Sequence, residues 1–290
     1  GGGGVDDRFW SDHFGTGLIK LYYNEEPNLR VVNPKAAEPK GAALQRYRAL
    51  FRHSLQVMPD TTLVTDLQEY SDVDFRRDFL FREEYVTDTQ PESYISMVTN
   101  APEYSLSALV KKRLNRFQTM TESLPDLSVS IPSRQIGKSL LFADASTGLA
   151  SLITRNAHSE EDTDVVRVDS FEQVRYAMNL FRPVLVTPRA GMRQTYYTKD
   201  KQDPLFEGKG KRDIVSGQFN TGFDSSLKLF RIFPATTDVW NLDINQLRHV
   251  VTPTASYGYL HQPTVPNELL NFSTAGTTGN QISFGLENKL

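Results

Sequence analysis

The pattern of hydrophobic and polar positions is clearest in Arg212–Leu229. Odd positions include Phe219, Phe223 and Leu227, whereas the even positions, apart from Ile214, are polar or glycine. A period of two predicts a strand with one apolar face, because successive side chains of a strand point to opposite sides. Soluble strands usually have roughly 5–6 residues, whereas a strand that crosses a bilayer needs about 9–11. The length of this stretch therefore predicts a transmembrane β-strand.

The same alternation recurs along the chain and predicts about twelve strands. In Leu44–Val57, for example, Tyr47, Phe51 and Leu55 oppose Arg48 and further polar residues. No stretch has a comparable helical stripe, so the fold is predicted to be all-β. The predicted strands are Gly17–Asn24, Leu44–Val57, Thr61–Ser71, Ser93–Asn100, Tyr104–Asn115, Asp126–Arg134, Ser139–Ile153, Ser170–Arg182, Leu185–Thr198, Arg212–Leu229, Gln246–Leu260 and Gln281–Leu290.

The connections between these strands alternate between long and short. Long ones include Asp72–Glu92, Thr154–Asp169 and Lys199–Lys211. Short turns occur at Pro59, Pro102 and Pro183. The alternation fails once, at Phe230–Asn245, which is long where a short turn is expected. Up-and-down outer-membrane barrels sort their loops in this way. We therefore expect an antiparallel up-and-down transmembrane β-barrel with extracellular long loops and periplasmic turns.

In such a barrel the polar half of each strand faces the lumen and the apolar half faces lipid. The candidate lumen-lining residues are Arg46, Arg48, Arg52, Ser216, Gln218, Asn220, Asp224 and Lys228. Aromatic residues near the strand ends suit interfacial girdles. The girdle candidates are Tyr22, Tyr23, Phe79, Phe81, Tyr85, Tyr196, Tyr197, Phe230, Phe233, Trp240, Tyr257 and Tyr259.

Composition and charge exclude several classes of protein. Lys plus Arg is 32 and Asp plus Glu is 35, so the net charge of −3 gives no electrostatic reason to bind nucleic acid. No run approaches the roughly 18 apolar residues of a membrane helix. The five histidines are not at ligand spacing and there is no cysteine, so neither a metal site nor thiol chemistry is predicted. We predict no enzyme and no cofactor.

Both ends of the chain suggest a piece of a longer protein. The first residues are glycines and the last ones, Gln281–Leu290, look like a strand cut short. We expect one partial barrel domain over residues 1–290, forming an open curved sheet in isolation. A closed small barrel would instead require Gly17–Asn24 to pair with Gln281–Leu290.

The stretch Tyr70–Phe79, with sequence YSDVDFRRDF, resembles the "SD.D...DF" signature of the LptD family of lipopolysaccharide-assembly (organic solvent tolerance) proteins. Further segments resemble that family in the same order, at Asn115–Leu127, Leu185–Tyr197 and Leu247–Tyr259, and the likeness spans about Gly15–Leu290. Ser123 stands where the family often has Arg. The candidate motif-loop residues are Asp72, Asp74, Arg77, Asp78 and Phe79.

The resemblance implies a translocon in the outer membrane of a Gram-negative-type bacterium that inserts lipopolysaccharide into the outer leaflet. It implies a lumen filled by an LptE-like lipoprotein plug and fed by a periplasmic Lpt bridge. The family's periplasmic jellyroll and the closing strands of its barrel are expected outside this chain, and the lateral gate with them.

Two alternatives stay open at this point. A porin or a plugged receptor barrel for small solutes would share the composition and the alternation. A soluble, extended β-sheet binding protein would share the strands, and dependence on detergent would distinguish it.

Overall fold

The structure is a computed structural model that describes residues 2–26, 44–86, 90–157, 162–181, 183–201, 212–234 and 246–289. Its first strands are β1 (Gly2–Ser11), β2 (Gly15–Glu26), β3 (Leu44–Met58), β4 (Thr61–Tyr70), β5 (Tyr94–Asn100), β6 (Ser105–Lys111), β7 (Met120–Gln135) and β8 (Leu141–Arg155). The later strands are β9 (Thr163–Tyr176), β10 (Met178–Leu180), β11 (Val184–Lys199), β12 (Arg212–Leu227), β13 (Leu229–Phe233), β14 (Leu247–Leu260) and β15 (Gly279–Lys289).

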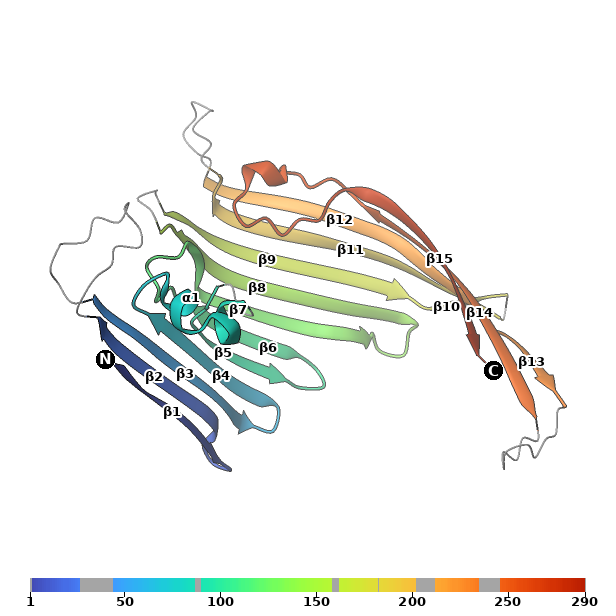
Figure 1. Cartoon of the computed structure of the whole chain (residues 1–290). Helices are drawn as coiled ribbons and strands as arrows, with labels where there is room; N and C mark the ends of the chain where they lie inside the picture. The colour runs from blue at the N-terminus through green and yellow to red at the C-terminus, as the bar shows by residue number, and fades with distance from the viewer. Residues whose placement is uncertain are drawn as a thin grey trace. The chain divides into compact units, whose positions relative to one another are not determined.

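Helical structure in the described residues is confined to short turns (Figure 1). These are α1 (Phe75–Phe79), the π-helical turn η1 (Phe81–Tyr85) and the 3-10 turn η3 (Asn267–Leu269). No helix in these segments is long and apolar enough to cross a membrane.

The strands pair in the sheet order β1-β2-β3-β4-β5-β6-β7-β8-β9-β11-β12-β14-β13, with β10 on β11 and β15 on β14. The ladders whose register is defined are antiparallel. Within the described segments no ladder joins β1 or β2 to β15. The predicted all-β, antiparallel up-and-down fold is confirmed.

The chain forms two compact units. The first contains Gly1–Val129 and Gly148–Arg167, and the second contains Ser130–Thr147 and Val168–Leu290. The division passes through β7, β8 and β9, so each unit is a run of neighbouring strands with a polar and an apolar face.

The predicted count of about twelve strands is too low, because the described residues alone form a sheet of 15. Strand β1 begins with glycines, which give no alternation of side chains to detect. Strand β13 falls in the stretch predicted as a connection and pairs with the first half of β14. Strand β9 begins at Thr163, within the predicted loop Thr154–Asp169. The predicted loop Asp72–Glu92 contains α1 and η1.

The exposure of apolar and polar side chains on the two faces of the sheet is the reverse of that in a water-soluble sheet. Large apolar side chains are exposed, among them Met97 at 45%, Val129 at 44% and Phe219 at 47%. Polar side chains are buried, among them Arg48 at 6% and Gln218 at 7%. An exposed apolar face opposite a polar face is the arrangement of a sheet that faces lipid.

Candidate functional site

The polar face of the first unit includes the even-numbered residues of β3 and β4. Register places Arg48 opposite Tyr70 and Arg52 opposite Asp66. Arg52 Nε donates to Asp66 Oδ2 at 2.8 Å. Charged groups on adjacent strands therefore pair across this face.

Arg46 on β3 fixes the segment after β4 against the same face. Its Nε and Nη2 donate to the two carboxylate oxygens of Asp72 at 3.0 and 2.8 Å, and its Nη1 donates to Asp78 at 2.9 Å. The guanidinium also lies 4.8 Å from the centroid of the Phe79 ring. A planar guanidinium suits both tasks, since it offers a fork of donors and a surface for aromatic rings. Arg46 is 5% exposed, so these contacts are largely shielded from water.

Phe75 of α1 packs the same segment onto the sheet through aromatic contacts. It is 1% exposed, and its ring centroid lies 5.7 Å from that of Tyr22, 5.9 Å from that of Tyr70 and 5.0 Å from that of Phe79. Edge and tilted ring pairs at these separations are favourable beyond the area that they bury. The segment after β4 is thus held by both charge and aromatic packing.

These contacts correct the girdle prediction for three residues. Tyr22 and Phe79 pack on each other at 5.5 Å over the polar face. Tyr197 is 1% exposed and its hydroxyl accepts a hydrogen bond from the backbone of Thr274. Tyr197 is therefore buried, and Tyr22 and Phe79 are partly buried where folded-over segments pack on the polar face. Trp240 lies outside the described residues.

The predicted motif-loop residues come together in one cluster. Asp72 and Asp78 bind Arg46, while Arg77 pairs with Asp74 at 3.0 Å and with Asp78 at 3.2 Å near the surface. Asp72 also accepts the backbone N–H of Asp74 at 3.1 Å, which begins the turn into α1.

Asn115 joins a second family-like segment to this cluster. Its Oδ1 accepts the backbone N–H of Tyr70 at 2.8 Å, and its Nδ2 donates to the carbonyl of Gln68 at 3.0 Å. Ser93 bonds to the N–H and carbonyl of Gln68 in the same manner. At the end of β4, the side chains of Ser93 and Asn115 therefore form the backbone hydrogen bonds that a neighbouring strand would otherwise form. Sequence reasoning gave Asn115 no such role, since nothing local signals these contacts.

In the second unit, the segment His261–Gly276, called the strap, covers part of β12. Its anchor is Gln218, whose Nε2 donates to the carbonyls of His261 and Gly276 at 2.8 and 2.9 Å. Gln218 Oε1 accepts the N–H of Gly276 at 2.9 Å. Backbone bonds from His261 and Thr264 to the carbonyls of Phe219 and Gly217 add to the attachment.

Thr274 ties the strap to β9 and β11 as well. Asp169 Oδ1 accepts hydrogen bonds from the hydroxyls of Thr195 and Thr274 at 2.6 and 3.0 Å. Arg193 Nη1 donates to the carbonyl of Thr274 at 2.5 Å. The strap is therefore bonded to three strands of the polar face, and sequence periodicity carries no signal for it.

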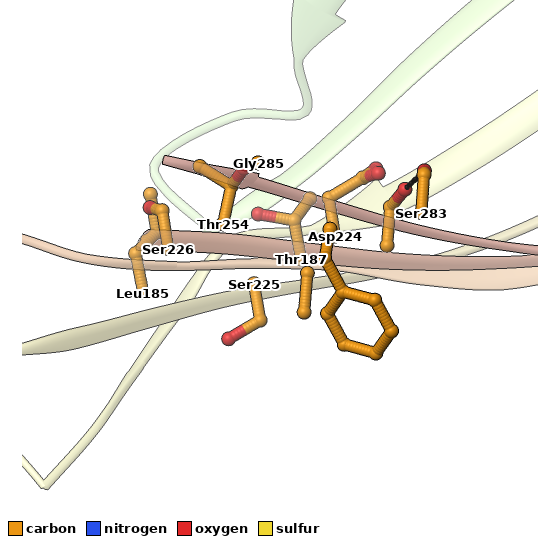
Figure 2. A pocket seen from close by; sticks show the side chains of 11 residues that line it. Leu185, Thr187, Asp224, Ser225, Ser226, Thr254, Ser283 and Gly285 are labelled. Carbon is orange, nitrogen blue, oxygen red and sulfur yellow. Dashed lines mark hydrogen bonds between the residues drawn. The ribbon is translucent and has the colours of Figure 1, made fainter. Parts of the chain in front are cut away.

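Further along the same sheet, a cavity lies at β11, β12, β14 and β15 (Figure 2). Register aligns Thr187, Asp224, Ser256 and Ser283 in one row across these strands. They line a cavity of about 460 Å³ together with the neighbouring row of Leu185, Ser226, Thr254 and Gly285 and with Ser225, Ala255 and Phe284. Most of this lining is small side chains, and it includes six hydroxyl groups.

The structure places the candidate lumen-lining residues in different environments. Arg46 and Arg48 are buried among the residues of the motif cluster, and Ser216 and Gln218 are buried on the strand that the strap covers. Asn220 is partly buried, whereas Arg52, Asp224 and Lys228 are exposed. Opposite faces are confirmed for Phe219 and Gln218 by register and burial. That the polar face lines a lumen stays a prediction.

A family model described as "LptD: LPS transport system D" matches residues 45–286. No curated protein sequence matches the chain. Among solved structures, an outer membrane protein of Vibrio cholerae, OmpT folded in vitro, is similar at 12% identity, with 97% of this chain and 98% of that chain covered and a TM-score of 0.26. Its loop L8 deletion mutant is similar at 11% identity, with 98% and 88% covered and a TM-score of 0.25. At these TM-scores the overlap of the folds is slight.

Proposed function

Because the chain belongs to the LptD family, we propose that it forms part of the wall of a translocon that inserts lipopolysaccharide into the outer leaflet of the outer membrane. Family membership gives the coarser assignment, which is lipopolysaccharide transport at the outer membrane. The finer role rests on the faces of the sheet. A single observation supports it most directly, namely that polar side chains such as Arg48 and Gln218 are buried on one face while Met97, Val129 and Phe219 are exposed on the other.

The physical demand on such a wall follows from the chemistry of its substrate. Lipopolysaccharide joins a polar sugar portion to several acyl chains, so it cannot cross a bilayer by simple diffusion. The sugar portion needs a wet, polar surface, and the acyl chains need contact with lipid. A sheet with a hydrogen-bonding face and an apolar face meets both demands at once.

We propose an LptE-like lipoprotein as the plug on the polar face and a periplasmic bridge as the source of substrate. Support for a plug comes from the exposed polar groups of this face, such as Arg52 and Asp224, which offer hydrogen bonds to a partner. No bond-making chemistry is assigned to the chain, and the work of transport is supplied from outside it.

Photo-crosslinking in the full-length protein tests this function. A photoreactive residue at Ser54, on the polar face of β3, should crosslink to lipopolysaccharide only while its synthesis continues. The matched position is Leu55, whose side chain points to the other face and contacts bulk lipid, so its adducts should persist after synthesis stops. Adducts at Ser54 that do not depend on synthesis, or uptake of small solutes without delivery of lipopolysaccharide, would favour a porin instead.

A further inference from the structure

We propose that the outer edge of β13, the edge that faces away from β14, is a docking site for an extended segment of another protein. That segment adds to the sheet as a further strand and carries a carboxylate opposite Arg231. The inference goes beyond the proposed function and does not depend on it. It is argued from the register of β12, β13 and β14 and from the charges around β13.

Strand β13 continues β12 along the same edge of β14. Register pairs Ser226 of β12 with Thr254 and Leu229 of β13 with Val251, so no residue is inserted or lost between the two strands. The ladder is interrupted between these pairs, where Pro253 has no N–H to donate. The two strands therefore form one extended segment over residues 212–233.

On its outer side, β13 extends past its neighbour. Strand β11 begins at Val184, opposite Leu227 of β12, and therefore does not run alongside β13. In the part of the chain that the structure describes, the sheet ends at β13 on this side (Figure 1). All five residues of β13 are exposed. The strand is thus a protruding edge that is accessible from both faces.

The ladder indicates which backbone groups of β13 are free. The N–H of His261 donates to the carbonyl of Phe219 at 2.9 Å, so the odd-numbered residues of β12 turn their backbone groups toward β14. The same parity continues into β13, which leaves the N–H and C=O groups of Phe230 and Ile232 on the outer edge. Unpaired groups in such a row are a template for an added strand.

The charges around β13 determine which kind of strand fits. The described residues 228–234 and 246–252 include Lys228, Arg231 and Arg248 but no Asp or Glu. The guanidinium of Arg231 lies 5.1 Å from the centroid of the Phe233 ring and has no carboxylate partner among the described residues. A carboxylate on the added strand would supply that partner, because opposite charges directly across a ladder stabilise the pairing.

A second copy of the chain does not suit this edge. Antiparallel pairing of two β13 strands over their whole length would place Arg231 opposite Arg231, and like charges directly opposite each other destabilise a ladder. Leu229 and Phe233 flank Arg231 on the same face and are 50% and 40% exposed. The strand that fits therefore has an acidic residue with an apolar residue two positions away on either side.

Peptide binding to the purified full-length protein in lipid nanodiscs tests the site. The probe is a blocked peptide in which valine, glutamate and valine alternate with threonine, and its control has lysine in place of glutamate. The glutamate peptide should bind about fivefold more tightly than the lysine peptide. Arg231→Glu keeps the backbone edge and should invert that preference. Binding of neither peptide, or equal binding of both, overturns the inference.

A second pair of variants tests the backbone of the edge. Ile232→Pro removes an outward N–H and no hydrogen bond to β14, so affinity for the glutamate peptide should fall at least about fivefold. Ile232→Thr keeps the N–H and a β-branched side chain, so its affinity should stay within about twofold of that of the unaltered protein. Equal affinities of the two variants overturn the inference. Dimers of the unaltered protein that Ile232→Pro abolishes would identify a second copy as the occupant and also overturn it.

Discussion

At the residue scale, the polar face is unusual in burying arginine. Arg46, Arg48 and Arg76 are each about 5–6% exposed, although charged side chains are almost never fully buried unless they are paired. Arg46 is paired with two carboxylates, those of Asp72 and Asp78. Its guanidinium carbon also lies 4.8 Å from the centroid of the Phe79 ring and 5.7 Å from that of the Phe75 ring. Arg46 on β3 therefore holds the motif cluster through charge, alongside the aromatic packing of Phe75.

Replacing Arg46 with Ala should destabilise the protein by about 2–3 kcal/mol. This is less than the roughly 3–5 kcal/mol for breaking a fully buried pair, because the side chains of Asp72 and Asp78 are 31% and 37% exposed to water. Denaturant unfolding of the full-length protein in lipid measures the loss. Arg77→Ala is the control, since Arg77 is 45% exposed and a surface pair contributes about 0–1 kcal/mol. Equal losses in both variants would contradict the assignment.

The hydrogen bonds that Asp162, just before β9, accepts should depend on pH. Its hydrogen bond from Arg155, and then the one from the backbone N–H of Asn156, hold the pKa of the Asp162 carboxyl below its usual value. A depressed pKa means that the contact is intact at neutral pH and is lost as pH falls through that lowered value. Hydrogen exchange at the Asn156 N–H, corrected for intrinsic rates, should lose its protection in acid. Asp162→Asn should lower that protection at neutral pH; unchanged exchange in the variant would refute the link.

At the element scale, long strands determine the faces and folded-over segments determine what covers them. Strands β11 and β12 pair without interruption from Val184 opposite Leu227 to Tyr197 opposite Ile214. The strap and the motif cluster each cover one patch of the polar face through side-chain hydrogen bonds. The strands form the polar face, and segments distant in sequence cover parts of it.

Reversing the polarity of one face should be far more costly than the same change on the other. Val129→Arg on the exposed apolar face of β7 should cost about 2–4 kcal/mol if it faces the middle of the bilayer, whereas Ser130→Arg on the polar face should cost under about 1 kcal/mol. Unfolding of the full-length protein in bilayers compares the two. Similar costs would remove the distinction between the faces of this strand.

Removing the anchor of the strap should release it without unfolding the sheet. Gln218→Ala deletes three hydrogen bonds to His261 and Gly276 and should raise hydrogen exchange in the strap by roughly tenfold or more. Gln173→Ala is the matched control, because the side chain of Gln173 on β9 accepts a long hydrogen bond of 3.4 Å from Asn220, which lies outside the strap. Unchanged exchange in Gln218→Ala would mean that Thr274 and Asp169 suffice to hold the strap.

Sequence alone predicted the strands better than the segments between them, for a physical reason. Faces such as those of Phe219 and Gln218 follow from a local period of two, which each strand carries in itself. The strap and α1 are fixed by partners far along the chain, such as Gln218 with Gly276 and Arg46 with Asp78. No local pattern encodes such pairs. The motif residues were identified from the sequence, whereas the pairing of Asp72 and Asp78 with Arg46 was not.

At the scale of the whole molecule, membership in the LptD family and the inverted faces agree on an outer-membrane sheet. Short turns join β3 to β4 and β5 to β6, whereas longer segments join β4 to β5 and β11 to β12. The predicted topology puts the longer segments outside the cell and the short turns in the periplasm.

Epitope tags test this orientation in intact cells. A tag inserted after Val86, which is 62% exposed beyond η1, should be reachable by antibody from outside the cell. A tag at the Pro102 turn should become reachable only after the outer membrane is permeabilised. Labelling of the Pro102 tag on intact cells would invert the topology.

The uninterrupted pairing of β11 with β12 also limits how this protein can change in length over evolution. A single inserted or deleted residue within β12 would transfer every following side chain to the opposite face; an insertion before Phe223, for example, would place Phe223 where Asp224 now meets Arg189. Two-residue changes preserve the parity. Insertions and deletions inside the strands should therefore involve even numbers of residues. The segments that join the strands should accept insertions and deletions of any length.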